Sequence, residues 1–114
     1  MRPLTLKQQA DQDASHSSHD SHTSHHARIT ILVDNSAAQP GLATEHGLSM
    51  WIETENKRVL FDTGQGYALP INAAALDVDL SQTNTIVLSH GHYDHTGGLC
   101  HLLKNPVIPP IYVS

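Results

Sequence analysis

Apolar positions are concentrated after residue 27, where short runs alternate with polar turns. Residues 29–35 (ITILVDN), 48–54 (LSMWIET) and 58–64 (RVLFDTG) combine β-branched or alternating apolar side chains with flanking turn residues, which predicts three strands. The polar turn at residues 55–57 separates the last two runs and predicts that they form a hairpin. The ordered part of the chain is therefore expected to begin with a sheet, near Arg28.

The later part of the chain alternates between helical and strand patterns. Residues 67–79 (YALPINAAALDVD) have a spacing compatible with a helix, although Pro70 restricts where that helix can start. Residues 85–89 (TIVLS) are a short continuous apolar run, which is typical of a strand buried on both faces. A second helix is expected from Asp94 through Leu103, and residues 106–114 (PVIPPIYVS) begin another strand.

Residues 1–27 differ from the rest because Ser, His, Asp and Gln dominate and apolar side chains are sparse. This composition cannot bury enough apolar area to offset chain entropy, which predicts a disordered His- and Ser-rich tail. Histidine recurs at every third position and is then doubled, at His16, His19, His22, His25 and His26. The repeat indicates either a weak, flexible metal-collecting arm or a polar tail that binds metal only incidentally. The elements expected in residues 28–114 indicate one layered α/β domain.

The composition excludes several classes of function. A net charge of -5 with only six Lys and Arg residues provides no basic surface for nucleic acid or for an anionic membrane. No apolar run is long enough to cross a bilayer, and the N-terminus lacks the apolar segment of a secretory signal. We therefore expect a cytoplasmic protein that binds neither nucleic acid nor membrane. The single cysteine, Cys100, lies in an apolar run and is expected to be buried rather than a nucleophile.

Residues 89–98 (SHGHYDHTGG) bring three histidines and an aspartate within six positions. His90 and His92 are two residues apart, so in an extended segment their side chains point to the same side and can grip one ion. Asp94 and His95 are adjacent at the start of the expected helix and point toward a neighbouring position. The set therefore suits two divalent metal ions. Imidazole nitrogen and carboxylate oxygen, without thiolate, indicate zinc, with iron or manganese as alternatives.

The chemistry expected of such a centre depends on its open coordination positions, which hold water. A bound metal lowers the pKa of that water to about 7, so that hydroxide forms at neutral pH. Asp94 is the candidate catalytic residue, either as a metal ligand, as the base that orients the water, or as both.

The segment SHGHYDHTGG resembles the signature of the metallo-β-lactamase-fold hydrolases. Residues 45–66 (EHGLSMWIETENKRVLFDTGQG) resemble the first hairpin and the DTG turn of the same family. The segments ITILVDNSA and EHGLSMWIE are similar to a branch that includes a dihydropterin-linked ribofuranosylaminobenzene phosphate synthase. The resemblance covers residues 29–114 and implies the N-terminal half of an αββα sandwich.

The resemblance also implies roles for individual residues. His90 and His92 would bind a first metal ion, and Asp94 and His95 a second. Asp62, in the sequence FDTG, would fix the backbone of the metal loop by hydrogen bonds. From the residues alone, Asp62 indicates an Asx turn, and the two interpretations are compatible.

Five further side chains have weaker signals. His46, in TEHG, either lines the mouth of the site or is simply solvated. His101 is six residues after His95, which is not a same-face helical spacing, so we expect it at the surface or supporting the site. Trp51 and Tyr67 are expected to pack in the core, whereas Tyr93 is a candidate for contact with substrate.

The chain differs from the family in its length and in lacking the metal ligands that come later in the family's sequences. Members of the family are about twice this length or more, and their remaining metal ligands come from the second half of the fold. Residues 104–114 contain no His, Asp or Glu. We therefore expect either an N-terminal fragment or a half-domain completed by a second copy or a second chain. Alone, the 114 residues are expected to be inactive and marginally stable, because they form half of a sandwich core.

Three functions are compatible with these features. The first is a metal-dependent hydrolase that uses metal-activated water on a small-molecule substrate, with a dinuclear site that this chain leaves incomplete. The second is a synthase or transferase of the same fold that acts on a pterin or phosphoribosyl substrate. The third is a non-enzymatic metal-binding protein or an inactive remnant.

Overall fold

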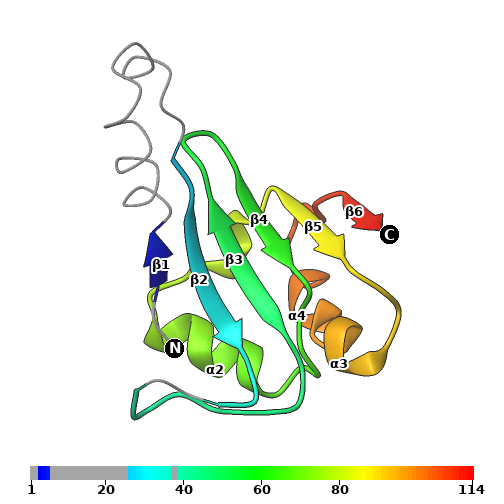
Figure 1. Cartoon of the computed structure of the whole chain (residues 1–114). Coiled ribbons are helices and arrows are strands. Elements are labelled where there is room, and N and C mark those ends of the chain that lie inside the picture. The colour runs from blue at the N-terminus through cyan, green and yellow to red at the C-terminus, as the bar shows by residue number, and fades with distance from the viewer. Residues whose placement is uncertain (1–2, 6–25, 37–38) are drawn as a thin grey trace.

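The computed structural model describes residues 3–5, 26–36 and 39–114 of the chain. Strands in this part form one sheet whose spatial order follows the sequence (Figure 1). Strands β1 to β4 are antiparallel neighbours, whereas β5 runs parallel to β4 and β6 runs parallel to β5. The bounds of the strands are Pro3–Thr5 (β1), Arg28–Val33 (β2), Ser49–Glu53 (β3), Arg58–Phe61 (β4), Thr85–Leu88 (β5) and Ile111–Val113 (β6).

The helices lie in the two connections that join the parallel strands. Between β4 and β5 are α2, Ala68–Ala75, and the short 3-10 helix η2, Leu80–Gln82. Between β5 and β6 are α3, Tyr93–Thr96, and α4, Leu99–Leu102. None of the helices in the described part of the chain has the length and apolar character needed to span a membrane.

The predicted hairpin is confirmed. Trp51 is paired with Leu60 and Glu53 with Arg58, and the Thr54 N–H donates to the Lys57 carbonyl across the turn at 2.9 Å. The other predicted strands correspond to β2, β5 and β6. Sequence alternation therefore located the central sheet.

The N-terminal region adds one short strand that the sequence did not predict. Residues Pro3–Thr5, inside the segment expected to be disordered, form β1 and pair with β2. Residues 6–25, which carry most of the histidine repeat, lie outside the described residues. Their disorder and any metal-collecting role stay predictions.

One face of the sheet carries the core. The fully or nearly fully buried apolar side chains of the strands alternate with half-buried ones, so they point to a single face. Helices α2 and α4 cover this face. The core is formed by Leu32, Val33, Trp51, Leu60, Ala68, Leu69, Ile86, Leu88 and Leu102. The packing role predicted for Trp51 is confirmed, since only 2% of this residue is exposed.

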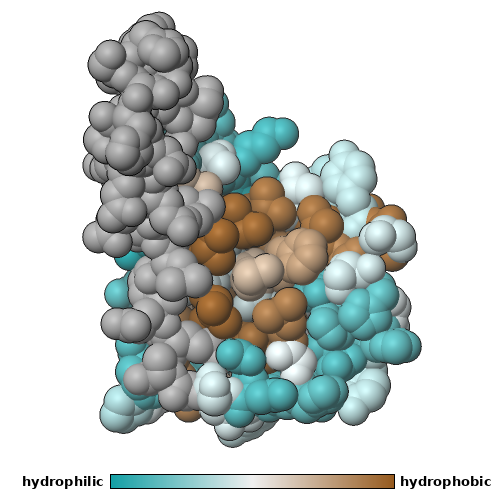
Figure 2. Space-filling model, viewed as in Figure 1, coloured by the Kyte–Doolittle hydropathy of each residue, from teal (hydrophilic) through white to brown (hydrophobic). Residues whose placement is uncertain are grey.

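The opposite face of the sheet is also apolar. Side chains alternate along each strand, and the strand register puts one set of apolar residues on this second face. They are Ile29, Ile31, Met50, Ile52, Val59, Phe61, Val87 and Tyr112. Figure 2 shows this apolar surface at the centre of the molecule, seen from the side opposite α2. No described helix packs on it. The prediction that β5 is buried on both faces is therefore wrong for this chain, because Val87 points to the open face and is only half-buried.

The second predicted helix is interrupted. Instead of one helix from Asp94 through Leu103, the chain forms α3 and α4, separated by Gly97 and Gly98. A Cβ atom on Gly97 would lie 2.2 Å from the Gln65 carbonyl oxygen, and a Cβ atom on Gly98 would lie 2.2 Å from the Thr63 carbonyl oxygen. The helix breaks here because the glycine backbone packs directly against residues 63–65.

A buried asparagine connects α2 to the end of β2. The Asn72 side chain is fully buried and donates to the carbonyls of Leu32 at 2.7 Å and Ala43 at 2.8 Å. Its Oδ1 accepts the Ala43 N–H at 2.7 Å. These hydrogen bonds hold the loop after β2 on α2, and this loop leads directly into the segment that enters the site.

We predict that Asn72→Ala lowers the free energy of unfolding by about 1–3 kcal/mol, because it leaves these backbone groups without partners. Urea denaturation followed by circular dichroism measures the change. The matched control is Asn56→Ala in the exposed hairpin turn, for which we expect a change within about 0.5 kcal/mol. Equal effects of the two substitutions would contradict the role of Asn72.

Candidate metal centre

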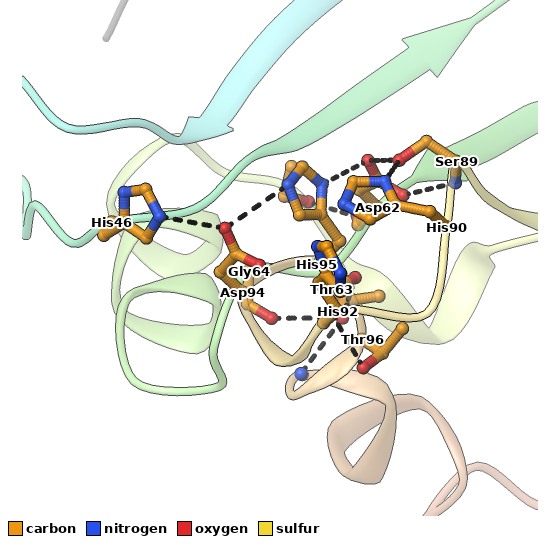
Figure 3. A network of polar contacts seen from close by, with 12 residues as sticks. His46, Asp62, Thr63, Gly64, Ser89, His90, His92, Asp94, His95 and Thr96 are labelled. Carbon is orange, nitrogen blue, oxygen red and sulfur yellow. Dashed lines mark hydrogen bonds and ion pairs between the residues drawn. The ribbon is translucent and has the colours of Figure 1, made fainter.

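Three segments meet at one edge of the sheet. Because β4 and β5 are parallel neighbours, their carboxyl ends lie side by side, and they lead into residues 62–66 and 89–98. Strand β3 is antiparallel to β4, so its amino end, preceded by residues 45–48, lies at the same edge. The Leu48 carbonyl accepts the Gly64 N–H at 2.9 Å, which joins the first segment to the second. Side chains distant in the sequence are thereby brought together (Figure 3).

His90, Asp94 and His95 form a compact group of potential metal ligands. Each offers a ligand atom, and these atoms lie within 4.8 Å of one another. The His95 Nε2 atom is 3.5 Å from the Asp94 Oδ2 atom, and the His90 and His95 ring centroids are 4.1 Å apart. The Asp94 and His95 side chains are 13% and 16% exposed, so the group is close to the surface but not fully solvated. Two imidazoles and one carboxylate at this spacing fit a divalent cation.

His92 lies beside this group rather than within it. Its ring is nearly perpendicular to the His90 ring, at 86°, with 4.7 Å between the centroids. The strand ends at Leu88 and His92 is the N-cap of α3, so the extended geometry expected for His90 and His92 does not continue through both residues. The structure thus groups His90 with Asp94 and His95, and the ligand role of His92 stays a prediction.

Asp62 occupies an unusual backbone conformation between β4 and α2. Its φ of 57° lies in the left-handed region, which is uncommon for a residue other than glycine. The Asp62 N–H donates to the Val87 carbonyl at 2.8 Å, and the Ser49 hydroxyl donates to the Asp62 carbonyl at 2.7 Å. These bonds to the neighbouring strands fix the backbone of Asp62 and direct its fully buried side chain toward the metal loop.

The Asp62 carboxylate controls the orientation of two histidines. Its Oδ1 accepts the Ser89 N–H at 2.7 Å, and its Oδ2 accepts the Ser89 hydroxyl at 2.6 Å. The same Oδ2 lies 2.7 Å from the His95 Nδ1 atom, and a carboxylate can only accept, so Nδ1 carries the hydrogen. The predicted hydrogen bonds from Asp62 to the metal-loop backbone are therefore present.

Ser89 extends this control to His90. The Ser89 Oγ atom is 2.8 Å from the His90 Nδ1 atom. Because the single hydroxyl hydrogen is donated to Asp62, His90 must donate its Nδ1 hydrogen to Ser89. With Nδ1 used in these hydrogen bonds, Nε2 is the ring nitrogen that His90 and His95 can each offer to a metal.

Thr63 holds the end of α3 and the turn that follows it. Its N–H and its hydroxyl both donate to the His95 carbonyl, at 2.8 and 2.9 Å, and its Oγ1 accepts the Gly98 N–H at 3.0 Å. Residue 63 is fully buried. The sequence DTG thus supplies a carboxylate for the histidine rings and a hydroxyl for the backbone that carries them.

Sequence reasoning missed Ser89 and Glu45. Only the position of Ser89 directly before His90 could have indicated its contact. Glu45 accepts the Ala68 N–H at the start of α2 at 2.8 Å and the N–H of Gln65, so it ties the loop before β3 to the loop after β4. His101 was expected either at the surface or supporting the site. Its Nε2 donates to the Gly66 carbonyl at 2.7 Å, which links α4 to the loop after β4.

Two predictions about individual side chains are wrong. Cys100 is exposed, because Leu102 on the short helix α4 points to the core and Cys100 lies on the other side. Tyr67 does not pack in the core but is 66% exposed immediately before α2. Tyr93 is equally exposed, at 66%, between His92 and Asp94, and its contact with substrate stays a prediction.

Residues 43–114 match the family model of the metallo-beta-lactamase superfamily. The match covers more than half of the chain and includes the Asp62 loop, the histidine cluster and all three segments that meet at the sheet edge. This chain belongs to the metallo-beta-lactamase superfamily.

Two proteins of Methanocaldococcus jannaschii are similar to this chain in sequence. An uncharacterized protein is 45% identical over 80 residues, which are 70% of this chain and 31% of that protein. The enzyme 7,8-dihydropterin-6-methyl-4-(beta-D-ribofuranosyl)-aminobenzene-5'-phosphate synthase is 41% identical over 88 residues, covering 70% of this chain and 30% of that enzyme. The chain thus spans less than a third of the length of either relative.

A solved structure agrees at the level of the fold. The short form of human tRNase Z aligns with a TM-score of 0.51 and 21% identity, over 75% of this chain and 33% of that protein. The predicted fold class, a layered part of a metallo-β-lactamase fold, is confirmed.

We predict that Asp62→Asn weakens zinc binding by about 10- to 100-fold, because an amide nitrogen cannot accept the hydrogens of both Ser89 and His95. Stability should fall by about 1–3 kcal/mol for the same reason. Calorimetric zinc titration and urea denaturation measure the two effects. Asp77→Asn is the matched control, since Asp77 has a φ of 58° but is exposed. A loss of similar size in the control would show that the left-handed backbone, not the carboxylate, is responsible.

Proposed function

We propose that this chain is part of a metal-dependent hydrolase that acts on a small-molecule substrate with metal-activated water. The main support for the proposal is the orientation of two histidines. The Asp62 carboxylate orients His95 directly and His90 through Ser89, so that both imidazoles direct Nε2 toward the site beside Asp94. Membership in the metallo-beta-lactamase superfamily is consistent with such a centre.

The proposed cofactor is a pair of divalent ions, zinc in the first instance, with iron or manganese as alternatives. His90 and His92 would hold the first ion, and Asp94 and His95 the second. Bound ions would polarise the substrate and lower the pKa of a water molecule. The protein residues would orient Nε2 of His90 and His95 toward the ions and offer the Asp94 carboxylate as a ligand or as a proton acceptor.

The centre is proposed to be completed by further protein. The apolar open face of the sheet is the surface on which a second half of the fold, or a second copy of the chain, would pack and bring additional ligands (Figure 2). Sheets that stack face to face bury their inner side chains in this way. The chain alone, with only part of the ligand set, is proposed to bind metal weakly and to be inactive.

A synthase or transferase is the second candidate, and the methanogen enzyme supports it. That relative is a dihydropterin-linked phosphate synthase and is 41% identical over the aligned residues. The same centre would then act on a pterin or phosphoribosyl substrate. A non-enzymatic metal-binding protein is the third candidate, in which the centre and the histidine repeat only sequester ions.

Zinc titration of the chain distinguishes a built centre from adventitious binding. A tail variant with His16, His19, His22, His25 and His26 replaced by Asn removes the histidine repeat. We predict that this variant retains weak but saturable zinc binding, and that adding His92→Ala and Asp94→Ala weakens it by at least about 10-fold. Retained binding after these two substitutions, or lost binding in the tail variant alone, would assign the metal to other residues.

Activity provides a separate test of completeness. We predict that the 114-residue chain loaded with zinc gives no metal-dependent hydrolysis of p-nitrophenyl esters or bis-p-nitrophenyl phosphate above the rate of zinc in buffer. The expected reason is the partial ligand set. Turnover that disappears in His90→Ala would show instead that the chain suffices for catalysis.

A further inference from the structure

His46 is held close to the metal centre from outside the histidine cluster. Its Nε2 atom is 3.1 Å from the Asp94 Oδ2 atom, although the two residues are far apart in sequence (Figure 3). The same Asp94 oxygen is 3.5 Å from His95 Nε2. One carboxylate oxygen therefore lies between a histidine of the cluster and a histidine of the loop before β3.

The His46 side chain is 68% exposed, which by itself would indicate a solvated residue. Its backbone, however, is fixed on both sides. Gln65 Nε2 donates to the His46 carbonyl at 2.6 Å, and the preceding Glu45 is bonded to the N–H groups of Gln65 and Ala68. The fixed backbone and the contact with Asp94 together place the His46 ring at the rim of the centre.

The backbone after His46 contacts α3 directly. Gly47 has a φ of 153°, and a Cβ atom there would lie 2.5 Å from the Asp94 carbonyl oxygen. The Leu48 N–H is directed at the same carbonyl, at 3.4 Å. A residue with a side chain at position 47 would force the segment away from α3 and remove His46 from Asp94. The sequence EHGL therefore holds both the backbone and the side chain of Asp94.

We propose that His46 is a positioning residue of the metal centre, which holds the Asp94 carboxylate toward His90 and His95. The close contact of His46 Nε2 with Asp94 Oδ2, at 3.1 Å, restricts the rotation of the carboxylate. Asp94 is then preorganised as a ligand, and less freedom is lost when a cation binds. The inference rests on the proposed metal centre, but it assigns a role to a residue outside residues 90–95.

The test measures metal affinity in the full chain with the tail histidines replaced by Asn, as above. We expect His46→Ala to weaken zinc binding by about 10-fold or more, without lowering the temperature of unfolding of the metal-free protein. His46→Gln places an amide nitrogen near the position of Nε2 and should restore most of the affinity. His46→Asn is the matched control, because its amide is too short to reach Asp94 and should behave like Ala.

A double-mutant cycle shows whether His46 acts through Asp94. In an Asp94→Ala background, His46→Ala should change zinc affinity less than twofold. If the full effect persists in that background, His46 acts independently, as a ligand of its own, and the positioning role is overturned. Cobalt substitution adds a spectroscopic readout: a changed visible spectrum in His46→Ala, recovered in His46→Gln, is the expected result.

The outcomes separate this inference from the proposed function. If the parent protein binds zinc through His90 and Asp94 but His46→Ala binds equally well, the positioning role fails and the metal centre stands. If the parent protein binds no zinc once the tail histidines are removed, the metal centre and the positioning role both fail.

Discussion

The carboxylate of Asp62 is fully buried at the junction of β4 and β5, and the site depends on how it is satisfied. A buried carboxylate is costly unless hydrogen bonds replace its lost water. Here the replacements come from Ser89 and His95, both in the loop that follows the neighbouring parallel strand. Folding of the sheet and orientation of the candidate ligands are therefore coupled, because the carboxylate is satisfied only when the loop has its observed conformation.

The features that the sequence predicted well are those encoded locally. Alternating apolar residues located the hairpin around Trp51, and the density of histidine and aspartate located the group of potential ligands, three of which lie within six positions. Asp62 was identified through family resemblance, and only the resemblance indicated that its partners lie in the metal loop.

What could not be predicted depends on contacts between distant segments. Nothing in the residues around His46 indicates that a backbone anchored by Gln65 brings its ring to Asp94. The break at Gly97 is likewise a consequence of the Gln65 carbonyl, which lies more than thirty positions earlier in the sequence. Cys100 was misassigned because its apolar neighbours did not reveal that the helix is too short to bury both sides.

The close approach of Gly97 and Gly98 to residues 63–65 has a consequence for the evolution of the protein. Gly97 and Gly98 cannot gain a Cβ atom without displacing residues 63–65, because those Cβ atoms would lie 2.2 Å from the carbonyl oxygens of Gln65 and Thr63. Substitutions in the DTG loop and in the TGG turn are therefore not independent of each other. Among homologues the two segments should vary together as one inherited unit, while residues of the exposed hairpin turn diversify freely.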